Sequence, residues 1–391
     1  MVARGGPGTA LFHPVLCQIG YGKRLSTIIQ VKTMFDGVKG MPAKVCLGLS
    51  ALIMLVYAIN FIFFANCYTT DGTEATVDMD TGVWTAGEAC TSILTSGAAL
   101  DSENFGRGAE TLQLVGALML GLALSNFLIL NEGAKGKWSL MMPILAGLVI
   151  MSIVMIMGQD ELPNNNPLIA TLVVTSVYAG AYFLLKEEGV DEGLTFEVKG
   201  LQVEDKVTAG MFIVPVIVGL IFSINNLLFA DGYAGKADSS TFLPVLTEYF
   251  DSEPHASTPL QIQILGSLFV PYTLFAVNIL RTGPKGKWPI GHTSMFGIGF
   301  FALTTIIIFI MPDDSRWNNV DDTNAQLLQN VMISSLVWIL VVVGYIRLRD
   351  EGIEDGMTIN GEVPDKDLFL MKMYPAIMVA MTVIFVAVRM M

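Results

Sequence analysis

Long apolar stretches alternate with short polar segments along almost the whole chain beyond residue 44. A helix needs about 20 largely apolar residues to cross roughly 30 Å of bilayer hydrocarbon. Nine stretches fit that requirement, so the pattern predicts an all-α polytopic membrane protein with nine transmembrane helices. The expected spans cover approximately residues 45–65, 109–130, 139–158, 167–185, 207–230, 259–280, 289–311, 326–346 and 369–388.

Two sequence motifs of the polar segments occur twice. Residues 133–138 read GAKGKW and residues 283–288 read GPKGKW, so five of six positions agree. At average residue usage, such a match has a chance on the order of one in a million per alignment offset. The acidic decapeptide KEEGVDEGLT at 186–195 returns as RDEGIEDGMT at 349–358, with charge or apolarity kept at every change.

The order of the motifs indicates that a unit of four helices is duplicated. An Ile-Asn pair, which ends at Asn60 and again at Asn225, precedes the other two motifs in each half. Because four is an even number, both copies enter the membrane with the same polarity, and a pseudo-twofold axis along the membrane normal should relate them. The predicted organisation is a basic N-terminal segment at 1–44, two tandem parallel four-helix repeats at 45–199 and 205–362, and a C-terminal segment at 363–391 that holds the ninth helix.

The distribution of Lys and Arg predicts the orientation, because cytoplasmic loops are enriched in both. With the N-terminus inside, 18 of the 22 basic residues fall on the inner side. We therefore expect the N-terminus on the cytoplasmic side, or its stromal or matrix equivalent, and the C-terminus on the opposite side. Residues 1–44 carry six basic residues and one acid. They form either an amphipathic helix on the inner leaflet or an organelle-targeting segment.

The composition excludes several classes of protein. Hydrophobic residues make up 53% of the 391 and charged ones 15%, with a mean hydropathy of +0.59. Such a chain needs the lipid bilayer as its solvent and first partner. The net charge of −13 opposes nucleic-acid binding. Three histidines are too few for a haem- or chlorophyll-rich protein, and no span has a central lysine for retinal, so we expect no cofactor and no metal.

The spans have no Asp, Glu, Lys or Arg near their centres, which argues against proton relays, voltage sensors and ion-coupled pumps. The polar groups that remain are mainly amides and hydroxyls. The amides either line a path for a neutral solute or form interhelical hydrogen bonds, which contribute about 0.6 kcal/mol on average. The candidate path-lining residues are Asn60, Asn126, Asn225, Asn226 and Asn278, of which Asn60 and Asn225 form the pair matched between the halves.

The two GxKGKW turns resemble phosphate loops only superficially, because the Walker pattern GxxxxGK followed by Ser or Thr is absent. We interpret them as anchors, in which tryptophans occupy the aromatic belt while lysines set the topology and contact anionic headgroups. The expected interfacial anchors are Lys135, Lys137, Trp138, Lys285, Lys287 and Trp288.

The acidic decapeptides have two interpretations. Four carboxylates within residues 187–192 could collect a divalent cation, although the EF-hand spacing is missing. Gly189 and Gly193 fit helix termination, so a structural cap followed by a short ordered linker is the preferred interpretation.

Two cysteines, Cys67 and Cys90, share the first predicted outer loop. They form a disulfide if that compartment is oxidising, although cysteine spacing alone does not establish the bond.

Two functional hypotheses follow. The first is a passive channel or facilitator for a small neutral or weakly charged solute, with a path between the halves. The second is a non-transporting structural or assembly protein that packs into a homo-oligomer or a larger membrane complex. We expect no enzyme, because no nucleophile, acid–base pair or metal-ligand cluster is recognisable near a membrane face.

Overall fold

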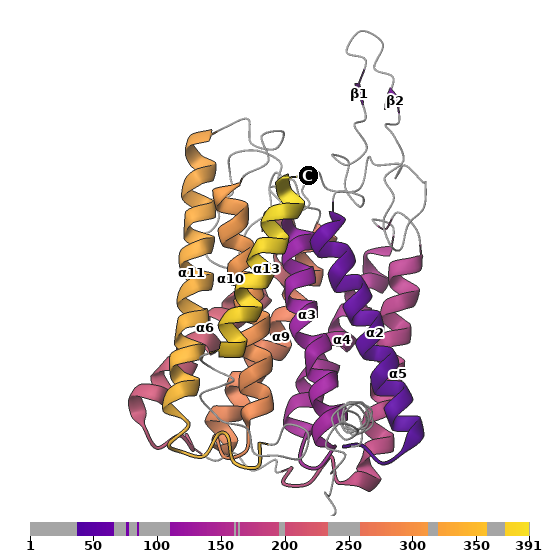
Figure 1. Ribbon diagram of the computed structural model, residues 1–391. Helices are drawn as coiled ribbons and strands as arrows, with labels where there is room; N and C mark the ends of the chain where they lie inside the picture. Colours follow the sequence, from indigo (N-terminus) through magenta and orange to yellow (C-terminus); the bar gives the residue numbers. More distant parts are fainter. Residues whose placement is uncertain are drawn as a thin grey trace, which may run out of the picture.

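Eight long apolar helices dominate the structure, a computed structural model that describes residues 37–65, 76–77, 84–85, 110–159, 162, 165–194, 200–233, 259–311, 320–357 and 372–390 (Figure 1). Each is long and apolar enough to cross a membrane, which supports a polytopic membrane protein. The helices coincide with the first eight predicted spans to within several residues. They are α2 (Met41–Phe63), α3 (Glu110–Glu132), α4 (Trp138–Met157), α5 (Asn166–Leu184), α6 (Lys206–Leu228), α9 (Pro259–Thr282), α10 (Trp288–Ile310) and α11 (Val320–Arg347).

The C-terminal helix is shorter than the sequence predicted. Helix α13 (Tyr374–Met390) has 17 residues, which at 1.5 Å per residue is about 25 Å and less than the hydrocarbon thickness. It begins at Tyr374, and Pro375 lies in its first turn, where a missing N–H donor costs no intrahelical hydrogen bond. The Tyr374 hydroxyl donates to the Met295 carbonyl (2.6 Å) and accepts from Trp338 Nε1 (2.8 Å), which fixes this end against α10 and α11. A ninth crossing stays a prediction.

Short elements complete the described chain. A 3-10 turn, η4 (Leu185–Glu188), follows α5, and α7 (Ala230–Tyr233) follows α6. The all-α expectation is modified by one small antiparallel ladder, in which β1 (Thr76–Val77) pairs with β2 (Trp84–Thr85).

The packing of the first four long helices is reproduced by the second four. Helix α2 packs against α3 and α5, and α6 packs against α9 and α11. The two groups then interlock, because α4 packs against α9 while α3 packs against α10. The helices α3, α4, α9 and α10 are the most buried of the eight, so they form the centre of the molecule.

The centre is closely packed. Gly121 on α3 and Gly297 on α10 face each other, and a Cβ on either would overlap its neighbours, including the Tyr272 hydroxyl. Tyr272 is 5% exposed and donates to the Leu118 carbonyl at 2.7 Å. Small residues allow helix backbones to approach in this way, so α3 and α10 are in close contact at Gly121 and Gly297.

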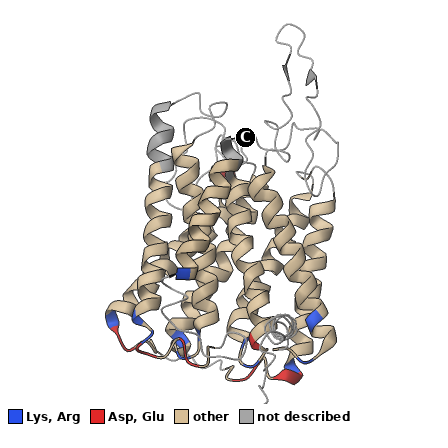
Figure 2. Cartoon of the chain, viewed as in Figure 1, with Lys and Arg blue, Asp and Glu red and all other residues tan. Residues whose placement is uncertain are grey.

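Most charged residues of the described part of the chain lie at one end of the bundle (Figure 2). This charged end comprises residues 37–40, 133–137, 185–194, 200–206, 281–287 and 347–357. It corresponds to the predicted inner side, and its sidedness stays a prediction.

Candidate functional site

The candidate path-lining asparagines are buried. The exposed fraction is 0% for Asn60, Asn126 and Asn225, 1% for Asn226 and 9% for Asn278. Asn126 Nδ2 approaches Met54 Sδ at 3.7 Å, and Asn278 Nδ2 donates to the Ser139 carbonyl at 2.9 Å. The Asn278 bond joins α9 to the first turn of α4, so this amide connects the two halves.

Asn226 alone among the five lines one of the cavities described here. This lateral cavity, of about 100 Å³, lies between α3, α6, α9, α10 and α11, and its walls are mainly apolar. The buried Asn226 Oδ1 has no hydrogen-bond partner among the described residues. Thr305 and Ser334, also in the wall, bond to each other at 2.8 Å.

The GxKGKW turns are held by the acidic decapeptides in the same way in each half. Gly136 N donates to Gly189 O at 2.9 Å, and Gly286 N donates to Gly352 O at 2.9 Å. Two positions later, Trp138 N and Trp288 N donate to carbonyls of the same two decapeptides. Gly136 and Gly286 adopt φ of 67° and 68°, which favours glycine, so the second glycine of the motif is required by the turn.

The two turns, distant in sequence, meet in space. Lys137 Nζ lies 5.6 Å from the ring centroid of Trp288, and Lys287 Nζ lies 5.1 Å from that of Trp138. Lys287 Nζ also donates to Ser139 Oγ at 3.3 Å. The contacts are reciprocal cation–π interactions, so each turn supplies the cation and the ring that the other uses.

The tryptophans of both turns are buried. Trp138 and Trp288 are each 4% exposed, so both indoles are surrounded by protein, and their place in the interfacial belt stays a prediction. Of the expected anchors, Lys135 and Lys285 are exposed, whereas Lys137 and Lys287 are half-buried. The depth of the turns in the membrane stays a prediction.

Burial also changes the lysine chemistry. Desolvation lowers the pKa of Lys137, while the charge of Glu132 acts in the opposite direction. Desolvation lowers the pKa of Lys287 as well, and the nearby charge of Lys137 adds to this effect. The two ammonium groups thus occupy a place where positive charge is unfavourable.

A polar hollow of about 210 Å³ separates the two turns. Lys135 and Lys285, on its rim, pair with Glu192 (3.2 Å) and Asp355 (3.9 Å). Its lining comprises Lys135, Gly136, Lys137, Trp138, Ser139, Leu140, Glu192, Gly193, Lys285, Gly286, Lys287, Pro289 and Ile290.

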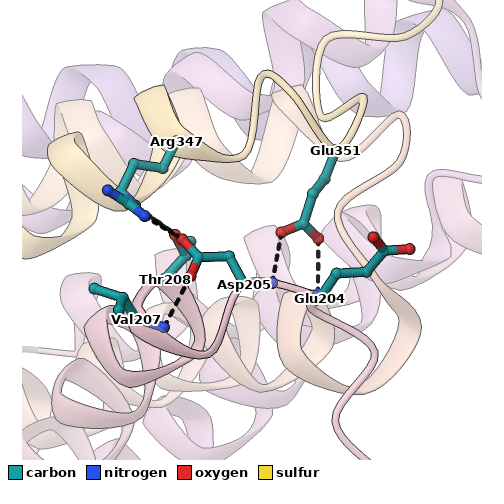
Figure 3. A network of polar contacts seen from close by, with 6 residues as sticks. All are labelled: Glu204, Asp205, Val207, Thr208, Arg347 and Glu351. Carbon is teal, nitrogen blue, oxygen red and sulfur yellow. Dashed lines mark hydrogen bonds and ion pairs between the residues drawn. The ribbon is translucent and has the colours of Figure 1, made fainter.

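The decapeptide carboxylates cap helix starts. Glu188 accepts from the backbone N–H groups of Lys39 (2.8 Å) and Gly40 (2.7 Å), directly before α2. Glu351 accepts from those of Glu204 (3.0 Å) and Asp205 (3.1 Å), directly before α6 (Figure 3). No group of three or more His, Cys, Asp or Glu that could hold a metal occurs within the described ranges.

Asp205 is the N-cap of α6. Its carboxylate accepts from Val207 N and the Thr208 hydroxyl and pairs with Arg347 at the end of α11 (Figure 3). The Thr208 hydrogen bond, followed by that of Arg347, lowers the pKa of Asp205 to about 2.

A buried polar network around His292, which the sequence analysis did not single out, joins α10, α11 and the second decapeptide. The Tyr345 hydroxyl lies 3.0 Å from His292 Nε2 and donates to Glu354 Oε1 at 3.2 Å. Arg349 completes the network through a 3.1 Å bond to Glu354. The signal was available, because in both halves a tyrosine occurs four residues before the basic residue that opens the decapeptide.

Cys67 and Cys90 lie outside the described residues, so their disulfide stays a prediction. Comparisons with protein-family models, curated proteins and solved structures find no match to this chain.

Proposed function

We propose that this integral membrane protein is a non-transporting structural scaffold, built from two four-helix repeats that pack closely against each other where α3 meets α10. The packing of Tyr272 between Gly121 and Gly297 carries the proposal, because a path between the halves would pass through this region. The burial of Asn60 and Asn225 is also typical of structural amides.

The repeat organisation, with units at 45–199 and 205–362, is supported by matched interactions. The turn glycines Gly136 and Gly286 make equivalent hydrogen bonds of equal length, and Glu188 and Glu351 cap equivalent helices. The helix pairings α4–α9 and α3–α10 are exchanged by a twofold operation. A parallel duplication about an axis along the membrane normal accounts for all three observations.

As a scaffold, the protein would pack through its lipid-facing helices into a homo-oligomer or a larger membrane complex. Large apolar side chains are exposed on the outer helices, among them Leu52 on α2, Ile217 on α6 and Ile339 on α11. In a bilayer these faces meet lipid or other helices. We further propose that the N-terminus lies on the cytoplasmic side and the C-terminus on the opposite side, which the Lys and Arg distribution supports.

Flux into liposomes tests the proposal against the facilitator hypothesis. We expect vesicles with the purified protein to swell in urea or glycerol gradients no faster than protein-free vesicles. The variant Asn60→Leu/Asn225→Leu should melt at a lower temperature and leave the flux at background. Asn330→Leu, a half-buried amide in the lateral cavity, is the matched control. Protein-dependent flux that the double variant abolishes would establish a path and overturn the scaffold proposal.

A further inference from the structure

The hollow between the two GxKGKW turns holds more positive charge than its carboxylates neutralise. Four lysines reach it, and the rim pair Lys135 and Lys285 have their own carboxylate partners. Among the described residues, no carboxylate lies within ion-pair distance of Lys137 or Lys287. Their neighbours are the two indoles and the Ser139 hydroxyl. The charge of Glu132 acts on Lys137, but neither Lys137 nor Lys287 forms an ion pair with a described carboxylate.

Two helix N-termini add to this positive potential. Helices α4 and α10 both begin at the hollow, with 20 and 23 residues respectively. Their N-cap residues are Lys137 and Lys287, neither of which makes a side-chain capping hydrogen bond. A helix N-terminus carries about half a positive charge and favours an anion. A negative group in the hollow would thus interact with both lysines and with both helix dipoles.

The size and polarity of the hollow restrict the anion. Its volume of about 210 Å³ lies below the range of roughly 300–1,000 Å³ in which drug-sized ligands bind. Lysine binds phosphate as a point charge, and Ser139 supplies a neutral hydroxyl beside it. Glu192, which also lines the hollow, is engaged by Lys135.

We propose that Lys137, Lys287 and Ser139 bind one phosphate group, shared between the two halves, in the hollow at the charged end. The group is either the headgroup phosphate of an anionic lipid or a soluble phosphate. A bound anion would offset the desolvation that lowers the pKa of both lysines and the repulsion by Lys137 that further lowers the pKa of Lys287. The site goes beyond the scaffold proposal and does not depend on it.

Equilibrium binding to the full-length protein in a neutral detergent tests the site. Tryptophan fluorescence and native mass spectrometry would follow titrations with inorganic phosphate, phosphatidic acid and, as a neutral-lipid control, phosphatidylcholine. We expect saturable binding of at least one of the first two, weakened by salt. Binding of inorganic phosphate identifies a soluble ligand, and binding of phosphatidic acid alone identifies a lipid headgroup.

Variants then locate the binding. Lys137→Gln/Lys287→Gln should lower the affinity about tenfold or more, because two charge-assisted contacts are lost. Lys44→Gln/Lys206→Gln removes the same charge at the starts of α2 and α6 and should change the affinity less than about twofold. Lys137→Arg/Lys287→Arg keeps the charge and should retain binding. If the glutamine variant does not fold, this arginine variant still tests whether positive charge at the two positions supports binding. Absence of saturable binding to wild type, or equal losses in the glutamine and control pairs, would overturn the proposal.

Discussion

The ammonium group of Lys137 lies 5.6 Å from the ring centroid of Trp288, a residue of the corresponding turn in the other half of the chain. The reverse contact, Lys287 with Trp138, completes the pair. Exposed cation–π pairs contribute about 0.5–1 kcal/mol, and desolvation strengthens the interaction. Here each ring is buried and each cation half-buried. The main consequence of these contacts is geometric, since they fix the two turns to one another.

The first prediction concerns the buried ring. Trp288→Ala should lower the free energy of unfolding by about 3–5 kcal/mol, because it leaves a cavity between the turns and removes a cation–π partner. Denaturant unfolding in detergent micelles measures the change. The control is Phe183→Ala, since Phe183 is 63% exposed and its truncation leaves no internal cavity. Equal effects of the two variants would show that Trp288 is not a packing centre.

A second prediction concerns the caps made by the decapeptides. Glu188→Gln and Glu351→Gln should each destabilise the protein by about 0.5–2 kcal/mol, because each weakens hydrogen bonds to the N–H groups that start a helix. The exposed Glu187, whose change to Gln leaves both caps intact, is the control. Thermal melts of the three variants provide the comparison. If Glu187→Gln had the larger effect, net charge rather than capping would explain the result.

The third prediction is a pH dependence at Asp205, whose pKa of about 2 lies below the ordinary value of 3.8. Between those values the unfolded chain binds more protons, so stability rises with pH. The contribution of Asp205 should be fully present above about pH 4 and lost as the pH falls through about 2. The difference in melting temperature between wild type and Asp205→Asn should accordingly shrink over this interval. Arg347→Gln should move the loss to higher pH, and a pH-independent difference would contradict the assignment.

A fourth prediction is topological. In a variant without native cysteines, single cysteines at the exposed positions Lys135 and Lys285 should react only with reagents applied from the side of the N-terminus. Cysteines at Asp78 and Asp314, which lie outside the described residues, should react only from the other side. The expectation rests on the 18 of 22 basic residues assigned to the inner side. Labelling of the cysteines at positions 135 and 78 from the same side of the membrane would contradict the predicted topology.

The length and apolarity of the stretches were sufficient to predict the eight long helices, because each span is set by local composition and by the thickness of the bilayer. The start of α13 could not be read from Pro375 alone, because Pro143, Pro215 and Pro271 lie inside other long helices. The burial of Trp138 and Trp288 could not be predicted either, because it depends on two turns that meet only after the halves dock. A repeated motif reveals common descent, while its contact with its own copy is a property of the assembled fold.

The fate of the amides illustrates the same limit. An asparagine in an apolar span is equally compatible with a wet path and with a hydrogen bond to a neighbouring helix. Asn278 forms such an interhelical hydrogen bond, because its Nδ2 donates to the Ser139 carbonyl of the other half. Whether an amide finds such a partner depends on which helix packs opposite it. That packing is determined by residues along the whole of α4 and α9.

The capping glutamates have a consequence for biosynthesis. Glu188, which follows α5, holds the backbone of Lys39 and Gly40 that leads into α2, so the end of the fourth helix closes upon the start of the first. Every group needed for that closure has been synthesised before α6 begins. The first four helices can therefore associate while the ribosome is still translating the second four. The surface of α4 that packs against α9 is then already formed when α9 is inserted.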